Sequence, residues 1–163
     1  MIYALILILL VFCAYRYDIR GVHKGQGEWY TFFLFVFILL IGLRYRIGTD
    51  SITYERWFYS SDLPTLGKIT VDTFSQKYEP LFILFGSVVK TVFESWVIFQ
   101  LLHAIIVNTI AFHFFKKYSQ APFICVVIYY LWLLFPLNCE IMRQSIAASV
   151  FLLAIPYLLE KRF

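Results

Sequence analysis

The sequence predicts an all-α protein, a polytopic integral membrane helix bundle with about five transmembrane helices plus a short re-entrant or interfacial helix. Three observations predict this class. Of the 163 residues, 61% are hydrophobic and only 15% are charged, whereas soluble domains are about half apolar and about a quarter charged. The mean hydropathy is +0.77. Aromatic residues make up 21% of the chain, which suits side chains that meet acyl chains along a helix and headgroups at its ends.

Five apolar runs reach the length of about 17–25 residues that a crossing helix needs, alone or with flanking aromatic and snorkelling basic residues. They cover residues 2–15, 29–43, 96–115, 121–137 and 146–159. The first run lacks a preceding basic residue and a small-residue cleavage site, so it is predicted to be a membrane segment rather than a signal peptide. A sixth run, 81–93, is short, follows Pro80 and contains Gly86 and Lys90. We expect it to be re-entrant or interfacial.

The charges predict which ends of these helices share a side. Basic residues outnumber acidic ones in the short segments 16–28 and 116–117 and at 161–162, which places these segments inside the cell. The long loop 44–80 is then extracytoplasmic, and its five basic residues are balanced by Asp50, Glu55, Asp62, Asp72 and Glu79. This arrangement requires that 81–93 does not cross. The net charge of +4 is therefore interpreted as a signal of membrane topology. It predicts the lipid bilayer, and not nucleic acid, as the partner.

Candidate functional residues gather at the outer ends of the predicted helices. Arg44 and Arg46 leave the membrane together, and Arg143 lies at the start of the last helix. Because the arginine fork binds phosphate bidentately, these three side chains suit a diphosphate headgroup. Asp50 and Glu79 are carboxylates that could orient or deprotonate a hydroxyl. Tyr45, Tyr54 and Gln144 are the neighbouring candidate substrate-binding residues.

Structural roles for the same residues stay open at this point. Interfacial arginines also anchor helices or bind lipid headgroups, and Asp50 is suited to cap a short helix that runs through about Tyr59. Gln100, His103 and Asn108 lie inside the run 96–115, where we expect interhelical hydrogen bonds. The cysteines have no paired spacing, so neither a disulfide framework nor a metal site is expected.

Three motifs carry a resemblance to a known family. They are Gly42-Leu43-Arg44-Tyr45-Arg46-Ile47-Gly48-Thr49-Asp50 with Tyr54, then Tyr78-Glu79-Pro80-Leu81-Phe82, then Met142-Arg143-Gln144-Ser145-Ile146-Ala147. In order, spacing and membrane context they resemble the EpsG family of Wzy-like exopolysaccharide and O-antigen polymerases. The resemblance implies that 1–163 is one transmembrane domain and the N-terminal portion of a longer polymerase.

The resemblance also implies an activity. Such polymerases join oligosaccharide repeat units carried on undecaprenyl diphosphate at the outer face of the bacterial cytoplasmic membrane, for exopolysaccharide, capsule or O-antigen, and need no cofactor. A flippase and a chain-length regulator of the same pathway would be partners. Arg44, Arg46 and Arg143 would then neutralise the leaving diphosphate, and Asp50 or Glu79 would act on the acceptor hydroxyl. Two alternatives remain, namely a flippase or other transporter of lipid-linked sugars, and a noncatalytic membrane subunit.

Overall fold

The structure is a computed structural model, and it describes residues 1–48, 50–69 and 78–159. Asp72, Lys161 and Arg162, which contribute to the charge pattern above, lie outside these ranges. The described residues form helices and no strands, which confirms the all-α prediction. In chain order the elements are α1 (Ile2–Cys13), the π-helical η1 (Ala14–Ile19), α2 (Gln26–Gly42), α3 (Ser51–Tyr59), the 3-10 turn η2 (Leu66–Lys68), α4 (Pro80–Phe93), α5 (Trp96–Tyr118), α6 (Pro122–Ile128), the π-helical η4 (Tyr129–Leu133) and η5 (Pro136–Glu140), and α7 (Met142–Leu159).

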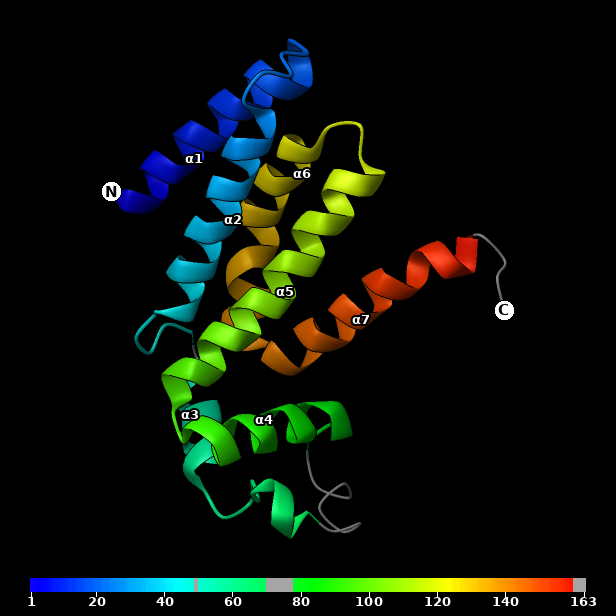
Figure 1. Cartoon of the computed structure of the whole chain (residues 1–163). Helices are drawn as coiled ribbons and strands as arrows, with labels where there is room; N and C mark the ends of the chain where they lie inside the picture. The colour runs from blue at the N-terminus through cyan, green and yellow to red at the C-terminus, as the bar shows by residue number, and fades with distance from the viewer. Residues whose placement is uncertain (49, 70–77, 160–163) are drawn as a thin grey trace.

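The helices form a bundle around α5, which contacts α2, α4, α6 and α7 (Figure 1). The η1–α2 and α5–α6 connections lie at one end of this bundle, which we call the connector end (Figure 1). Helices α3 and α4 lie at the opposite end, the α3–α4 end, where α4 runs across the bundle rather than along it (Figure 1). The two basic connections therefore share one end, and the described part of the long loop lies at the other. The charges predict the same grouping, and which end faces the cytoplasm stays a prediction.

Among the described residues, two helical stretches are long and apolar enough to cross a bilayer, namely Ile2–Ile19 and Trp96–Tyr118. Four shorter apolar helices accompany them, at Gln26–Gly42, Pro80–Phe93, Pro122–Leu133 and Met142–Leu158. Helical structure also continues past Leu133 through η5 to Glu140, because the chain there forms wider π turns rather than ending. The total of about five spans therefore stays a prediction.

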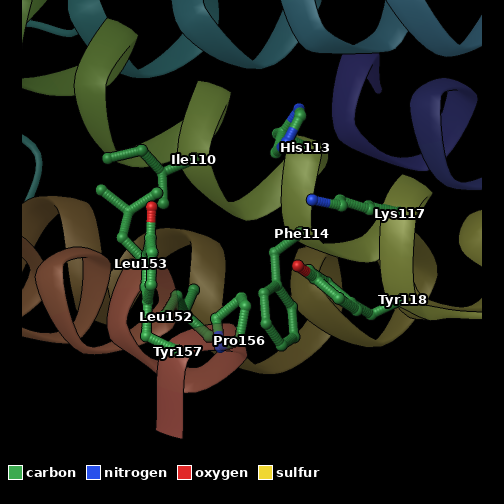
Figure 2. Close-up of a pocket in the computed structure, with 9 residues that line it drawn as sticks. All are labelled: Ile110, His113, Phe114, Lys117, Tyr118, Leu152, Leu153, Pro156 and Tyr157. Atoms are coloured by element: carbon green, nitrogen blue, oxygen red, sulfur yellow. The ribbon is translucent and has the colours of Figure 1, made fainter. Parts of the chain in front are cut away.

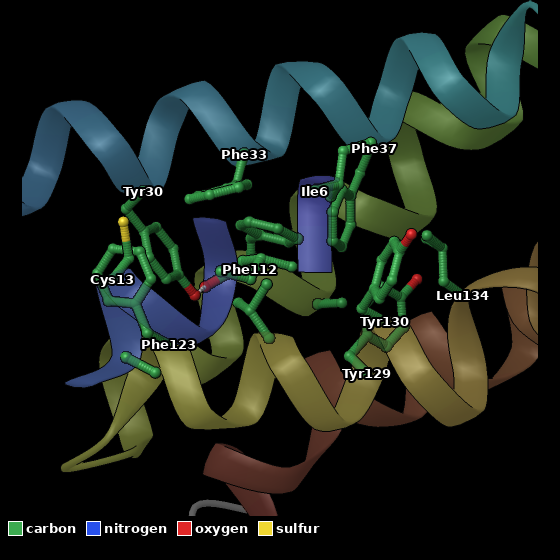
Figure 3. Packing of buried hydrophobic residues seen from close by; sticks show 14 of the residues in the cluster. Ile6, Cys13, Tyr30, Phe33, Phe37, Phe112, Phe123, Tyr129, Tyr130 and Leu134 are labelled. Atoms are coloured by element: carbon green, nitrogen blue, oxygen red, sulfur yellow. Dashed lines mark hydrogen bonds between the residues drawn. The ribbon is translucent and has the colours of Figure 1, made fainter. Parts of the chain in front are cut away.

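Buried side chains form two clusters. The larger, the bundle core, joins α1, η1, α2, α5, α6 and η4, and Figure 3 shows its aromatic rings projecting from α2 toward α5 and α6. Tyr30 of α2 donates its hydroxyl to the Phe112 carbonyl of α5 at 3.0 Å and stacks edge-on against Phe123 of α6. The smaller, the end cluster, packs α3 and α4 against Phe99 of α5 and against Met142 and Ile146 of α7. The end cluster therefore fixes α3 and α4 to the helices of the bundle.

The predicted interhelical hydrogen bonds are confirmed for two of three residues. His103 Nε2 lies 2.8 Å from the Ser145 hydroxyl and 3.1 Å from the Met142 carbonyl, both on α7. The Asn108 side chain bonds the Tyr129 hydroxyl at 3.0 Å and the Asn138 side chain at 3.4 Å. Gln100 is also buried, and its amide nitrogen has no hydrogen-bond partner within the described residues.

One boundary differs from the sequence prediction. The apolar run that predicts the last helix begins at residue 146, but α7 begins at Met142. Only Ile141, with φ −117° and ψ 46°, interrupts the helical path between η5 and α7. The carbonyl of Ile141 accepts the amide of Ser145 at 3.0 Å, so Arg143 and Gln144 belong to the first turn of α7. Arg143 and Gln144 therefore lie within a helix, where their positions are set by its geometry.

Candidate active site

Arg44 follows the last turn of α2 and is buried, with 6% of its surface exposed. Its guanidinium donates hydrogen bonds to the Ile41 carbonyl at 2.9 Å and the Asn138 carbonyl at 2.7 Å. A third contact, at 3.5 Å, reaches the Met142 sulfur. Burial lowers the pKa of this guanidinium from its ordinary value. Arg44 therefore joins the end of α2 to the segment that precedes Arg143.

Gly48 allows the loop 44–48, which begins at Arg44, to pack against η5. Its φ is +99°, a left-handed conformation that favours glycine, and a Cβ placed there would lie 2.9 Å from the Cβ and 3.0 Å from the carbonyl oxygen of Cys139. The loop 44–48 thus approaches the η5 backbone more closely than a side chain would allow. The first motif, through Gly48, therefore contacts the η5 segment that precedes the third motif.

Arg143 is the centre of a polar group at the α3–α4 end. Its Nη1 lies 3.3 Å and 3.4 Å from the two carboxylate oxygens of Glu79, and its guanidinium lies 5.2 Å from the centre of the Tyr78 ring. The Tyr54 side chain is a further hydrogen-bond partner. Arg143 retains 28% side-chain exposure and Glu79 retains 55%, so both reach the surface. The structure therefore brings together three predicted residues, Arg143, Glu79 and Tyr54, and adds Tyr78.

The backbone positions Glu79 as the residue just before α4. Pro80 occupies the first helical position, as predicted from its fixed φ and missing N–H, and the Glu79 carbonyl accepts the amides of Phe82 and Ile83 at 3.0 Å. Beneath the polar group, Trp57 stacks on Phe82 at 5.0 Å between ring centres and lies 4.8 Å from the Tyr78 ring. Burial is the main cause that raises the pKa of Tyr78, opposed by Arg143.

Arg46 belongs to a second, more exposed group. Its Nε lies 3.4 Å from Glu55, with 51% and 25% of the two side chains exposed, and its guanidinium lies 5.3 Å from the Tyr45 ring. Arg46, Glu55 and Arg56 line a surface hollow of about 450 Å³ on α3. Sequence reasoning missed Glu55 and Arg56 as companions of Arg46. The signal was present, because both follow Tyr54 directly on the predicted short helix.

The remaining predicted residues lie on the surface. Asp50 is exposed and precedes α3 as predicted, but its side chain makes no capping hydrogen bond, and only its carbonyl accepts the Tyr54 amide, at 3.0 Å. Its charge helps to raise the pKa of Tyr78, which places it within electrostatic range of the Arg143 group. Tyr45 is 77% exposed, and Gln144 points outward from the first turn of α7.

The described parts of the chain, 1–48, 50–69 and 78–159, hold no group of three His, Cys, Asp or Glu side chains that could bind a metal ion. At the α3–α4 end, these residues place arginine, aromatic and carboxylate side chains close together. Such a surface can bind a phosphorylated, hydroxyl-rich ligand through arginine forks and can accept a proton at a carboxylate.

Comparisons with known proteins identify a family. A comparison with curated proteins found no match, and none was found among solved structures. A family model described as the EpsG family matches residues 28–163, which include all three motifs and every residue of the candidate site. This membership, with the apolar helices, indicates a membrane protein of polysaccharide biosynthesis. The chain belongs to the EpsG family.

Proposed function

We propose that this protein is part of a membrane polysaccharide polymerase, a glycosyltransferase that joins oligosaccharide repeat units carried on undecaprenyl diphosphate. The observation that carries the proposal is the Arg143–Glu79 pair, a phosphate-binding fork held 3.3 Å from a carboxylate. Family membership supports the polysaccharide assignment. The acting side is the α3–α4 end, which the charge pattern predicts to be the outer face of the bacterial cytoplasmic membrane.

The three arginines take different roles in this proposal. Arg143 and Arg46 are exposed enough to reach a diphosphate, with 28% and 51% of their side chains accessible. They neutralise the charge that develops on the leaving diphosphate as its bond to the sugar breaks. Arg44 is buried and already donates to two carbonyl groups, so its role is to position the segment that leads to Arg143.

The ion pair at Arg143 is suited to exchange. An exposed ion pair contributes only about 0–1 kcal/mol to stability, because solvent screens it. A diphosphate, which carries more charge than a carboxylate, can therefore displace Glu79 from the Arg143 guanidinium. The released Glu79 then accepts the proton of the acceptor sugar hydroxyl. The hydroxyl oxygen forms the new glycosidic bond to the anomeric carbon, and the diphosphate leaves with the bonding electron pair. Asp50, within electrostatic range of the same group, is the alternative base.

The aromatic residues of the site supply the surface for the sugars. Tyr54 and Tyr78 flank Arg143, and their rings present flat apolar faces with hydroxyl groups at the edge. Tyr45 and Gln144 are exposed beside Arg46 and Arg143, where they can contact an incoming repeat unit. The flippase that delivers repeat units and the chain-length regulator of the pathway are the proposed protein partners.

The test is complementation in the host strain after deletion of its own copy of the gene. Arg46→Lys and Arg143→Lys keep the charge but lose the fork, and polymer length is read on a gel. Arg20→Lys, at the connector end, is the matched control. We expect both site variants, at normal expression, to leave single repeat units on the carrier lipid, whereas the control makes full-length polymer.

The same experiment separates the alternatives. A transporter would lose delivery of repeat units to the outer face, so carrier-linked units would stay protected from an external glycosidase. A noncatalytic subunit would tolerate both lysine substitutions. Full-length polymer in Arg46→Lys and Arg143→Lys would contradict the proposed role of the arginines.

A further inference from the structure

A cavity of about 460 Å³ lies between α5 and α7, away from the Arg143 group. Figure 2 shows its wall, to which α5 contributes Ile110 and Phe114 and α7 contributes Leu152 and Leu153. These side chains are apolar and leave room for an acyl chain. The cavity lies toward the end of α5 that leads to Lys117 and Tyr118, which is the connector end (Figure 1).

The mouth of this cavity is polar and cationic. Figure 2 shows the Lys117 amino group and the Tyr118 hydroxyl pointing from α5 into the space, with the Tyr157 hydroxyl on the α7 side. The Lys117 nitrogen lies 5.2 Å from the centre of the Tyr118 ring. Within the described residues, no carboxylate lines the cavity or pairs with Lys117. The site therefore offers the Lys117 cation and two tyrosine hydroxyl groups above an apolar cleft.

Pro156 leaves a hydrogen-bond acceptor unpaired within α7. Proline has no N–H, so the carbonyl of Leu152, four residues earlier in α7, lacks its usual helical donor. A ligand that carries hydroxyl groups can satisfy this carbonyl. The cavity thus combines a site for an anion, a site for a hydroxyl donor and an apolar cleft.

We propose that this cavity binds one anionic glycerophospholipid of the phosphatidylglycerol type. Its phosphate would pair with Lys117 and accept the Tyr118 hydroxyl, its glycerol headgroup would donate toward the α7 wall, and an acyl chain would lie along Ile110, Phe114 and Leu153. Charge favours this occupant, because basic pockets between membrane helices on the cytoplasmic side bind anionic headgroups. The excess of basic residues predicts that the connector end faces the cytoplasm. The proposal does not depend on the polymerase reaction.

The chain offers a matched control in the neighbouring lysine. Lys116 precedes Lys117 but its nitrogen lies 5.9 Å from the centre of the Tyr30 ring, on the side of α5 that faces α2. Lys116→Gln and Lys117→Gln therefore remove the same charge from the same helical turn, and only the second removes it from the cavity. A general attraction between basic residues and anionic lipid would be weakened equally by both.

The experiment titrates the purified full chain in detergent with phosphatidylglycerol or with phosphatidylcholine and counts bound lipids by native mass spectrometry. We expect tighter binding of phosphatidylglycerol, an affinity about fivefold lower in Lys117→Gln, and no change in Lys116→Gln. Leu153→Trp fills the apolar cleft and should remove the bound lipid while leaving both lysines in place.

Four results would overturn the proposal. They are equal binding of the two lipids, equal losses in the two lysine variants, unchanged binding in Leu153→Trp, and a dimer whose interface covers the cavity in place of lipid. No polymer is measured in this assay, so its failure is distinct from a failure of the proposed polymerase function.

Discussion

Arg44 and Arg143 have the same chemistry but different surroundings. The first is 6% exposed and donates to the carbonyls of Ile41 and Asn138, whereas the Arg143 side chain is 28% exposed and faces the Glu79 carboxylate. Arg44 is too buried for a surface ligand to reach, and its guanidinium already bonds two carbonyl groups. At the scale of single residues, the structure thus separates a buried Arg44, which holds two backbone segments together, from a partly exposed Arg143, which the proposed function assigns to the substrate.

The burial of Arg44 predicts that the same substitution destabilises the protein more at Arg44 than at the exposed Arg46. Arg44→Gln should destabilise the protein by about 1.5–3 kcal/mol, because it removes charged hydrogen bonds to buried carbonyls. Arg46→Gln removes only an exposed ion pair and should cost about 0–1 kcal/mol. Thermal unfolding of the purified variants in detergent measures both. Equal melting temperatures for the two variants would show that the Arg44 contacts do not hold the fold together.

Tyr129 tests the polar network inside the bundle. Its hydroxyl donates to Asn108 at 3.0 Å and accepts from Asn138 at 3.3 Å, so it links α5 to η5. Tyr129→Phe should lower stability by about 0.6–1.7 kcal/mol, the range for interhelical hydrogen bonds in membranes. Tyr45→Phe, at a 77% exposed position, is the control and should melt like the wild type. An unchanged melting temperature in Tyr129→Phe would mean that this network adds nothing to stability.

At the scale of elements, local signals in the sequence predicted several boundaries correctly. The helix starts at Ser51, Pro80 and Trp96 agree with the structure. Pro80 suits a first helical position through its own fixed φ, whereas the side chains of Asp50 and Ser95 make no capping hydrogen bond. The start of the last helix was wrong by one turn. The π-helical η5 continues to Glu140, and nothing in the apolar pattern distinguishes a π turn from the end of a helix.

Two glycines in α2 test the packing of that helix on α5. A Cβ at Gly42 would lie 3.0 Å from the Leu101 Cα, whereas a Cβ at Gly27 would meet nothing within 4 Å. Gly42→Ala should therefore separate α2 from α5 and lower the melting temperature. Gly27→Ala should leave it equal or raise it, because alanine favours a helix by up to about 1 kcal/mol. Stabilisation by Gly42→Ala would contradict the close approach of the two helices.

At the scale of the whole molecule, the candidate site depends on contacts that no local pattern reports. Arg44 meets Asn138, which lies 94 residues later, and Arg143 meets Glu79, 64 residues away. The charge pattern predicted that the candidate residues share one end of the bundle, and the structure places them at the α3–α4 end. The charge pattern could not predict which arginine is buried, because burial follows from how η5 packs against the loop 44–48.

The same arrangement makes a prediction about topology. If α4 lies across the bundle rather than spanning the membrane, Ser60→Cys and Asp62→Cys should react with a membrane-impermeant maleimide added to intact cells. Lys24→Cys and Gln120→Cys, at the connector end, should react only after the cells are opened. The labelling is done in a chain whose own three cysteines, Cys13, Cys125 and Cys139, are replaced by alanine. Labelling of Gln120→Cys in intact cells would mean that α4 crosses the membrane.

The most direct test of the central proposal is the reaction, in liposomes, of the purified polymerase of which this chain is part, supplied with single repeat units on undecaprenyl diphosphate. Mass spectrometry follows the formation of carrier-linked double units. The account predicts that the wild type makes this product, that Arg143→Lys makes it about 10²–10³-fold more slowly, and that Arg20→Lys matches the wild type. Equal rates in Arg143→Lys and the wild type would contradict the role of Arg143. Absence of product from the folded wild-type polymerase would contradict the proposed polymerase function.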